Sequence, residues 1–183
     1  MSKVAIQGNA SGTGTLTIAA PNTNTDRTLT LPDSAGTIDT LQRAGNVLQV
    51  VNAYTNGNTF SFSANYDNPF GPSASITPSS SANKILIIAT GSVYISASGE
   101  SHVDISANGV RISAGGFGDG LCLIYHPSTA MALPYVITHL HSPATTSTVT
   151  YSVIGHHIGG TKITSNSFRA SDLSQIFLLE IAS

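Results

Sequence analysis

Short runs of alternating apolar and polar residues fill the chain from Val47 to its C-terminus. Turn residues separate the runs, and Asn108-Gly109 is the strongest hairpin signal because this pair tolerates the positive φ angles of a two-residue turn. No ten-residue window combines helical spacing of apolar residues with helix caps. A break or bend is expected at Gly91. We expect strands near residues 47–55, 59–63, 73–77, 84–97, 102–107, 109–113, 121–126, 134–141, 148–154, 161–167 and 174–182.

These runs predict an all-β fold. Short strands at this spacing form a β-sandwich, a jelly roll or a barrel. Ser and Thr supply 46 of the 183 residues, whereas charged residues supply 9%. Thr is β-branched and Ser competes for backbone hydrogen bonds, so both form helices poorly. Charged side chains are also the usual guards of sheet edges. Because they are so scarce, we expect the edges to be buried in a closed oligomer with cyclic symmetry.

Residues 1–40 form a separate region with little apolar surface. Alternation over residues 13–18 and 28–31 predicts short strands, but a region this small and polar cannot build its own core. We expect this arm to pack on the C-terminal domain, on sister arms or on another protein. Residues 41–46 are the expected hinge, and 47–183 the expected sandwich. The apolar stripe of the arm contains Val4, Ile6, Leu16, Ile18, Leu29, Leu31 and Ile38.

Charge and hydropathy argue against several partners. The net charge is −2 and no segment clusters Lys or Arg, so the chain lacks a basic surface for nucleic acid or an acidic membrane. The longest apolar run, Ile85–Ala89, is far shorter than the roughly 20 residues that span a bilayer. The N-terminus lacks the apolar stretch of a signal peptide. We therefore expect synthesis in a cytoplasm and no membrane insertion.

Few residues suggest chemistry. His139 and His141 would share one face of a strand and are weak metal candidates, because no carboxylate or Cys stands nearby to complete a site. His156 and His157 are adjacent and are expected in a loop or on the surface. Cys122, the single cysteine, lies in an apolar run and is expected to act as a small buried hydrophobe. We find no nucleophile motif and no paired carboxylates, and expect no enzyme activity and no cofactor.

Carbohydrate binding is the alternative function that the residues leave open. Sugar sites often combine an exposed aromatic ring with amide, carboxylate and hydroxyl partners. Tyr66, Phe70 and Phe117 lie in Gly-, Pro- and Asn-rich segments that we expect to be loops, so they are the candidate glycan contacts. Tyr54 is a further candidate if it is exposed, whereas Tyr94 and Tyr151 lie in expected strands and are assigned to the core.

Several segments together resemble a known family. Gly8–Thr37 reads GNASGTGTLTIAAPNTNTDRTLTLPDSAGT, which resembles a segment of bacteriophage tail fibres and other virion appendage proteins. The later stretches VLQVV (47–51), SASITPSSSANKILI (73–87), HSPATTSTVTYSV (141–153) and FLLEIA (177–182) resemble the C-terminal β-sandwich of the same proteins. No single stretch is chemically diagnostic, but their order and joint presence are specific.

The resemblance implies a trimeric, jelly-roll-like knob on a phage particle, made in the host cytoplasm. Such fibres usually carry a longer anchoring region and shaft, whereas here Met1 stands almost directly before Gly8. We therefore expect a capsid decoration (cement) protein, held to the major capsid protein by the arm. The alternative is a short tail fibre or adhesin that binds glycans on the host surface. A free lectin fits the Gly8–Thr37 resemblance less well.

Overall fold

The chain divides into two compact units, Met1–Ile38 and Asp39–Ser183. The computed structural model describes residues 11–15, 17, 19, 22–26, 28, 43–56, 61–62, 68–95, 99–113, 120–126, 131–158, 163–165 and 173–183. In the first unit all described residues are exposed and none belongs to a strand. The strand expected over 13–18 is therefore wrong at its described positions. An alternating pattern forms a strand only where a neighbouring strand supplies hydrogen bonds.

The second unit is built from strands. Among its described residues there is no helix, and so none that could span a membrane. The all-β prediction is confirmed. The strands are β1 (Val47–Asn56), β2 (Ser61–Phe62), β3 (Asn68–Ile76), β4 (Lys84–Ile95), β5 (Gly99–Ala107), β6 (Val110–Arg111), β7 (Cys122–His126), β8 (Met131–His141), β9 (Val149–Ile158), β10 (Ile163–Ser165) and β11 (Leu173–Ile181).

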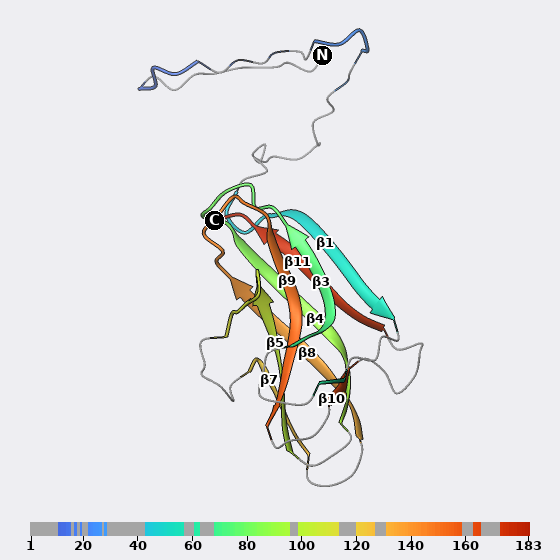
Figure 1. The fold of residues 1–183 in the computed structure, drawn as a ribbon. Coiled ribbons are helices and arrows are strands. Elements are labelled where there is room, and N and C mark those ends of the chain that lie inside the picture. Colours follow the sequence, from blue (N-terminus) through green and yellow to red (C-terminus); the bar gives the residue numbers. More distant parts are fainter. Residues whose placement is uncertain are drawn as a thin grey trace, which may run out of the picture. The chain divides into compact units, whose positions relative to one another are not determined.

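Two antiparallel sheets face each other as in a β-sandwich (Figure 1). Sheet A has the order β1-β11-β4-β10-β2, and β8 also pairs with β4. Sheet B has the order β3-β9-β5-β6, and β7 also pairs with β5. Strand β4 is the centre of sheet A, because β8 pairs along its length on one side while β11 and then β10 pair on the other. In the described pairing, β1 and β8 are therefore edge strands.

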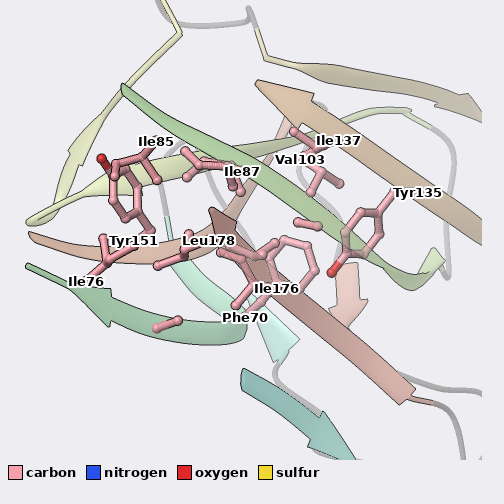
Figure 2. Close-up of a cluster of buried hydrophobic side chains, with 14 of the residues drawn as sticks. Phe70, Ile76, Ile85, Ile87, Val103, Tyr135, Ile137, Tyr151, Ile176 and Leu178 are labelled. Atoms are coloured by element: carbon pink, nitrogen blue, oxygen red, sulfur yellow. The ribbon is translucent and has the colours of Figure 1, made fainter. Parts of the chain in front are cut away.

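The core fills the space between the sheets (Figure 2). Every second residue of the central strands points into it, as Ile85 and Ile87 do from β4 and Ile176 and Leu178 do from β11, all with no exposed surface. The ring of Phe70 packs edge-on against Tyr135, with 6.0 Å between ring centroids. Residues on the alternate positions of the same strands must then point away from the core.

Local features agree with the sequence at the β5–β6 turn and differ elsewhere. Asn108 and Gly109 have φ angles of 50° and 81°, so the predicted two-residue hairpin is confirmed. Strand β3 begins at Asn68 rather than at residue 73, because a register shift between Pro69 and Ser73 carries the expected turn residues into the strand. Among the described pairs β3 bonds only to β9, and an edge strand tolerates proline.

The expected break at Gly91 is wrong, because β4 runs through it without a register shift. Its role is close packing. A Cβ at this position would collide with the hydroxyl oxygen of Ser174 and would lie 2.6 Å from that of Tyr135. Only a residue without a side chain allows β4 to lie this near to both hydroxyls. Burial raises the pKa of Tyr135 to about 12, so its hydroxyl stays protonated.

Candidate functional site

The outward face of sheet A carries large apolar side chains where a solvent surface would be polar. On β4 and β11 every second side chain points into the core, so the remaining side chains face outward. We call this surface the apolar face. It consists of Val50 and Tyr54 on β1, Leu173, Phe177, Leu179 and Ile181 on β11, Leu86 and Ile88 on β4, and Val136 and Leu140 on β8.

Strand register places these side chains in continuous rows. Leu179 lies opposite Val50 on one side and Leu86 on the other, and Leu86 lies opposite Leu140. One apolar row therefore crosses all four strands. The next row holds Phe177 beside Ile88. Side chains directly opposite one another on adjacent strands are in contact distance, so the first row is a continuous band of hydrocarbon. The second row ends in the polar residues Asn52 and Thr138.

The apolar face is exposed most at its two edges. The fractional exposure is 58% for Val50 on β1 and 66% for Val136 on β8, while the central Leu86 and Leu179 are half-buried. Four strands about 4.8 Å apart and roughly 27 Å long give the face a flat extent of roughly 500 Å². The largest apolar patch on an ordinary monomer covers about 300–600 Å² and is often functional. The whole face, with its polar positions included, is of this size.

The groups that interrupt the apolar face are almost all uncharged, namely Asn52, Gln175, Thr90 and Thr138. Among the described outward positions of its four strands, Lys84 is the one charged residue, and it lies at the end of β4 opposite Ile181. A shallow depression of ≈ 550 Å³ lies at the other end, lined by residues that include Thr90, Val136 and Leu173. The depression has no charged residue in its lining. Its composition suits another apolar surface better than a charged ligand.

The outward side of β3 and β9 in sheet B is polar. Three hydroxyl pairs join β3 and the residue after it to β9 and the residue before it, each with 2.8 Å between the oxygens. These hydroxyls hydrogen-bond to one another and remain open to water. This part of sheet B therefore differs from the apolar face of sheet A. The pairs are Ser73–Ser152, Ser75–Thr150 and Thr77–Thr148.

The two metal candidates lie on the core side of β8. His139 pairs with Ile87 and His141 with Ile85, and both imidazoles are half-buried. Nδ1 of His141 is 2.8 Å from the hydroxyl of Tyr151 and is engaged in that hydrogen bond. Burial first, and then the neighbouring His139, hold the pKa of His141 below its usual range. Within the described part of the chain, no cluster of three or more His, Cys, Asp or Glu residues forms.

Of the three candidate glycan contacts, the structure describes Phe70. Phe70 was expected in a loop, and this is wrong: it lies in β3 and is 1% exposed. The register shift beside Pro69 turns the ring inward against Tyr135. Tyr66 and Phe117 lie outside the described residues, as do the arm residues Val4, Ile6, Leu16, Ile18, Leu29 and Leu31.

Three other sequence expectations can be compared with the structure. Cys122 is a free thiol on the core side of β7, half-buried, and burial raises its pKa. This agrees with the role of a small hydrophobe. Tyr151 is fully buried, as expected, whereas Tyr94, also assigned to the core, is half-buried at an outward position of β4. His156 and His157 were expected in a loop or on the surface, but they lie within β9. The loop assignment is wrong because the strand continues past Gly155.

A buried acidic residue that sequence reasoning missed lies on the outward side of β5. Asp104 is fully buried, receives a hydrogen bond from the hydroxyl of Ser113, and has Nε of Arg111 at 3.8 Å. The residues that follow the β5–β6 hairpin thus fold over the sheet. A signal was available, because the Asn108-Gly109 turn fixes a register that brings Asp104 near Ser113. The arrangement fastens a loop and leaves no open site.

The sequence also did not predict an exposed aromatic residue on sheet B that could contact a glycan. Tyr125 on β7 is 69% exposed and lies opposite Glu100 on β5, whose side chain is 45% exposed. The neighbouring outward position on β7 holds Leu123, which is 58% exposed. Strand position alone assigned no role to Tyr125, because strand tyrosines usually lie in the core. Its exposure could be found only from the pairing of β7 with β5.

Comparison with known proteins adds no assignment. Neither the models of known protein families nor the curated proteins include a significant match to this chain. The functional argument therefore depends on the residues themselves and on the surfaces where the fold places them.

Proposed function

We propose that this chain is a non-enzymatic structural protein of a bacteriophage particle, a homotrimer that decorates and stabilises the capsid. The observation that carries the proposal is the apolar face of sheet A. Leaving its exposed apolar side chains in water is unfavourable by about 25 cal/mol for each Å² of apolar surface. A protein that associates with others covers such a surface in the assembly. The resemblance to phage appendage proteins suggests that the assembly is a phage particle.

The sandwich is proposed to be a jelly roll. The pairing order supports this: without the short strands β2, β6 and β10, sheet A reads β1-β11-β4-β8 and sheet B reads β3-β9-β5-β7. With eight strands numbered along the chain, one sheet then holds the first, eighth, third and sixth and the other the second, seventh, fourth and fifth. This is the order of a jelly roll formed from two Greek keys.

The N-terminal region, residues 1–40, is proposed to attach the protein to the major capsid protein. Met1–Ile38 is a compact unit of its own, which fits an arm that acts on another molecule. Deleting residues 1–40 should abolish binding to particles and leave a soluble oligomer. If the shortened protein still decorates particles at full occupancy, the attachment role is wrong.

Copy number tests the capsid location. Gel densitometry of purified particles should give hundreds of copies per particle for a decoration protein. Copies in the tens or fewer would instead indicate a tail component. The complete absence of the chain from purified particles would contradict the virion role altogether.

A short tail fibre or adhesin that binds host glycans is the second candidate, and the exposure of Tyr125 favours it. An exposed ring beside the Glu100 carboxylate offers an apolar platform and a hydrogen-bond acceptor to a sugar. A glycan array with the intact protein tests this reading. Binding that is lost in Tyr125→Ala supports it, and an array without any binder contradicts it.

A further inference from the structure

We propose that the apolar face is where copies of this chain bind one another, with the β8 edge of one copy beside the β1 edge of the next. The inference rests on the proposed function, because it names the partner that the apolar face takes in the proposed homotrimer. The face itself, its rows and its edges are properties of the fold. The identity of the occupant follows from charge, from the distribution of exposure and from area.

The charge pattern favours a second copy over an unrelated partner. Lys84 is the one charged side chain among the described outward positions of β1, β11, β4 and β8, and it lies at one end. Interfaces between different proteins usually carry complementary charges that select the right partner. A neutral hydrocarbon surface has no such selectivity, but it matches an identical surface without repulsion. The exposed hydroxyl rows on sheet B offer no comparable driving force.

Exposure is concentrated on opposite edges, and this favours a ring over a two-fold pair. On β1, Val50 and Tyr54 are 58% and 63% exposed; on β8, Val136 and Leu140 are 66% and 50% exposed. Both strands are also sheet edges in the described pairing, with backbone groups open on one side. In a ring of three or more copies, two different patches meet at each contact, whereas a two-fold pair joins identical patches. A ring therefore covers the β1 edge and the β8 edge of every copy.

Area requires the edge strands to take part. The apolar face has a flat extent of roughly 500 Å², whereas a standard specific interface buries about 800 Å² on each partner. A two-fold pair that used the face alone would fall below that standard. In a ring each copy divides the face between two neighbours, so each contact must also bury the open edges of β1 and β8.

Charge substitutions on the full-length chain test the occupant. Leu179→Asp places a carboxylate in the centre of the face, and Val136→Asp places one at its edge. Val136 is 66% exposed, so this second substitution should leave the fold of the single chain intact. Ser75→Asp is the matched control on the hydroxyl face. Sedimentation should show trimers for the unmodified chain and for the control. Both face variants should dissociate at concentrations roughly 100-fold higher or more, because a charge would be buried without a partner.

Three results would overturn the inference. The first is a monomeric unmodified chain at micromolar concentration, which would mean that the N-terminal unit or another protein covers the face. The second is an oligomer that neither face variant weakens, and the third is an equal loss in the Ser75→Asp control. Circular dichroism of each variant verifies the fold. If Leu179→Asp unfolds, Val136→Asp decides.

Cysteine cross-linking tests the order of the edges. In a Cys122→Ser background, Val50→Cys and Val136→Cys are combined and treated with a short bis-maleimide. The edge arrangement predicts covalent trimers when both cysteines are present and no cross-linked species with either one alone. Covalent dimers from a single variant would indicate a two-fold pair and overturn the ring, and an uncross-linked double variant would overturn the proposed edge contact.

The particle assay separates this inference from the proposed function. If the copies bind through the apolar face but purified particles lack the chain, the virion role fails and the interface remains. If particles contain the chain at high copy number while the free protein sediments as a monomer with the face open, the interface fails and the virion role remains.

Discussion

Replacing Glu180 by Gln perturbs the best-connected buried acid of the sandwich. Glu180 lies near the end of β11 and is 1% exposed. Its Oε1 accepts hydrogen bonds from the backbone N–H and the hydroxyl of Ser79 at 2.7 and 2.8 Å and from Nδ2 of Asn83 at 2.6 Å. Its Oε2 accepts from Nε2 of Gln49 at 2.6 Å. The carboxylate therefore ties the β3–β4 turn and β1 to the last strand.

The magnitude follows from these contacts. In Glu180→Gln, the amide oxygen can keep the role of Oε1, but the amide NH2 then faces the Nε2 donor of Gln49. Gln49 cannot simply rotate, because the same Nε2 also donates to the carbonyl of Thr77 at 2.7 Å. One buried donor loses its acceptor, which costs about 1–3 kcal/mol. We expect a loss of about this size in the free energy of unfolding.

The pKa of Glu180 fixes the sign of the pH dependence. Burial alone would raise this pKa, but the hydrogen bonds from Asn83, Gln49 and Ser79 outweigh burial and lower it from its usual 4.5. A carboxyl with a depressed pKa in the folded state stabilises the fold above pH 4.5. That contribution is lost as the pH falls below 4.5 through the folded-state pKa. Glu180→Gln should lack this component of acid destabilisation.

Urea denaturation at neutral pH and fixed protein concentration measures the loss in the free energy of unfolding. A series at lower pH measures how this free energy depends on the protonation of Glu180. The matched control is Glu100→Gln, because the side chain of Glu100 is 45% exposed and surface substitutions usually change stability by less than about 0.5 kcal/mol. Equal stability of Glu180→Gln and the unmodified protein, or superimposed acid profiles, would refute the reasoning.

Three further substitutions test separate parts of the fold. Gly91→Ala should destabilise the protein by about 1–3 kcal/mol in thermal denaturation, because its Cβ collides with Ser174; an unchanged Tm would contradict the packing. His141→Gln should reduce the loss of stability as the pH falls below 6.5, because burial lowers the pKa of His141 in the folded state. The free energy of unfolding measured over a pH series tests this. An unchanged pH dependence would mean that another group causes the loss. Asn108→Ala should cost about 1 kcal/mol, because it removes the 2.9 Å bond from the Thr150 N–H to the Asn108 side chain and places Ala at a positive φ; retention of full stability in urea would disprove it.

Strand positions in the sandwich could be predicted well because they depend on local alternation. The Asn108-Gly109 hairpin and the strands from Val47 and Lys84 needed only neighbouring residues for their assignment. Phe70 and Gly91 were misread because proline and glycine normally end strands. Here a register shift absorbs Pro69 in an edge strand, and Gly91 gives room to two hydroxyls from other strands. Both effects depend on partners far away in sequence.

The candidate site could be predicted only in part. Scarce charge indicated that edges must be buried, but alternation alone does not tell which face of a strand meets the core. Leu86 and Ile87 are equally apolar neighbours, and only the pairing of β4 with β11 and β8 assigns Leu86 to the outward face. The apolar face is therefore a property of four strands brought together. Tyr125 was missed for the same reason, because its exposure depends on a strand pairing.

Hydroxyl-radical labelling of side chains tests the central claim most directly, because it measures whether the apolar face is covered in the working protein. The full-length chain is labelled at dilute and at concentrated conditions, and the oxidation of Phe177 is compared with that of Tyr125. The account predicts that labelling of Phe177 falls as the protein assembles, while labelling of Tyr125 does not change. Equal labelling of Phe177 at all concentrations, in a protein that is nevertheless assembled, would contradict it.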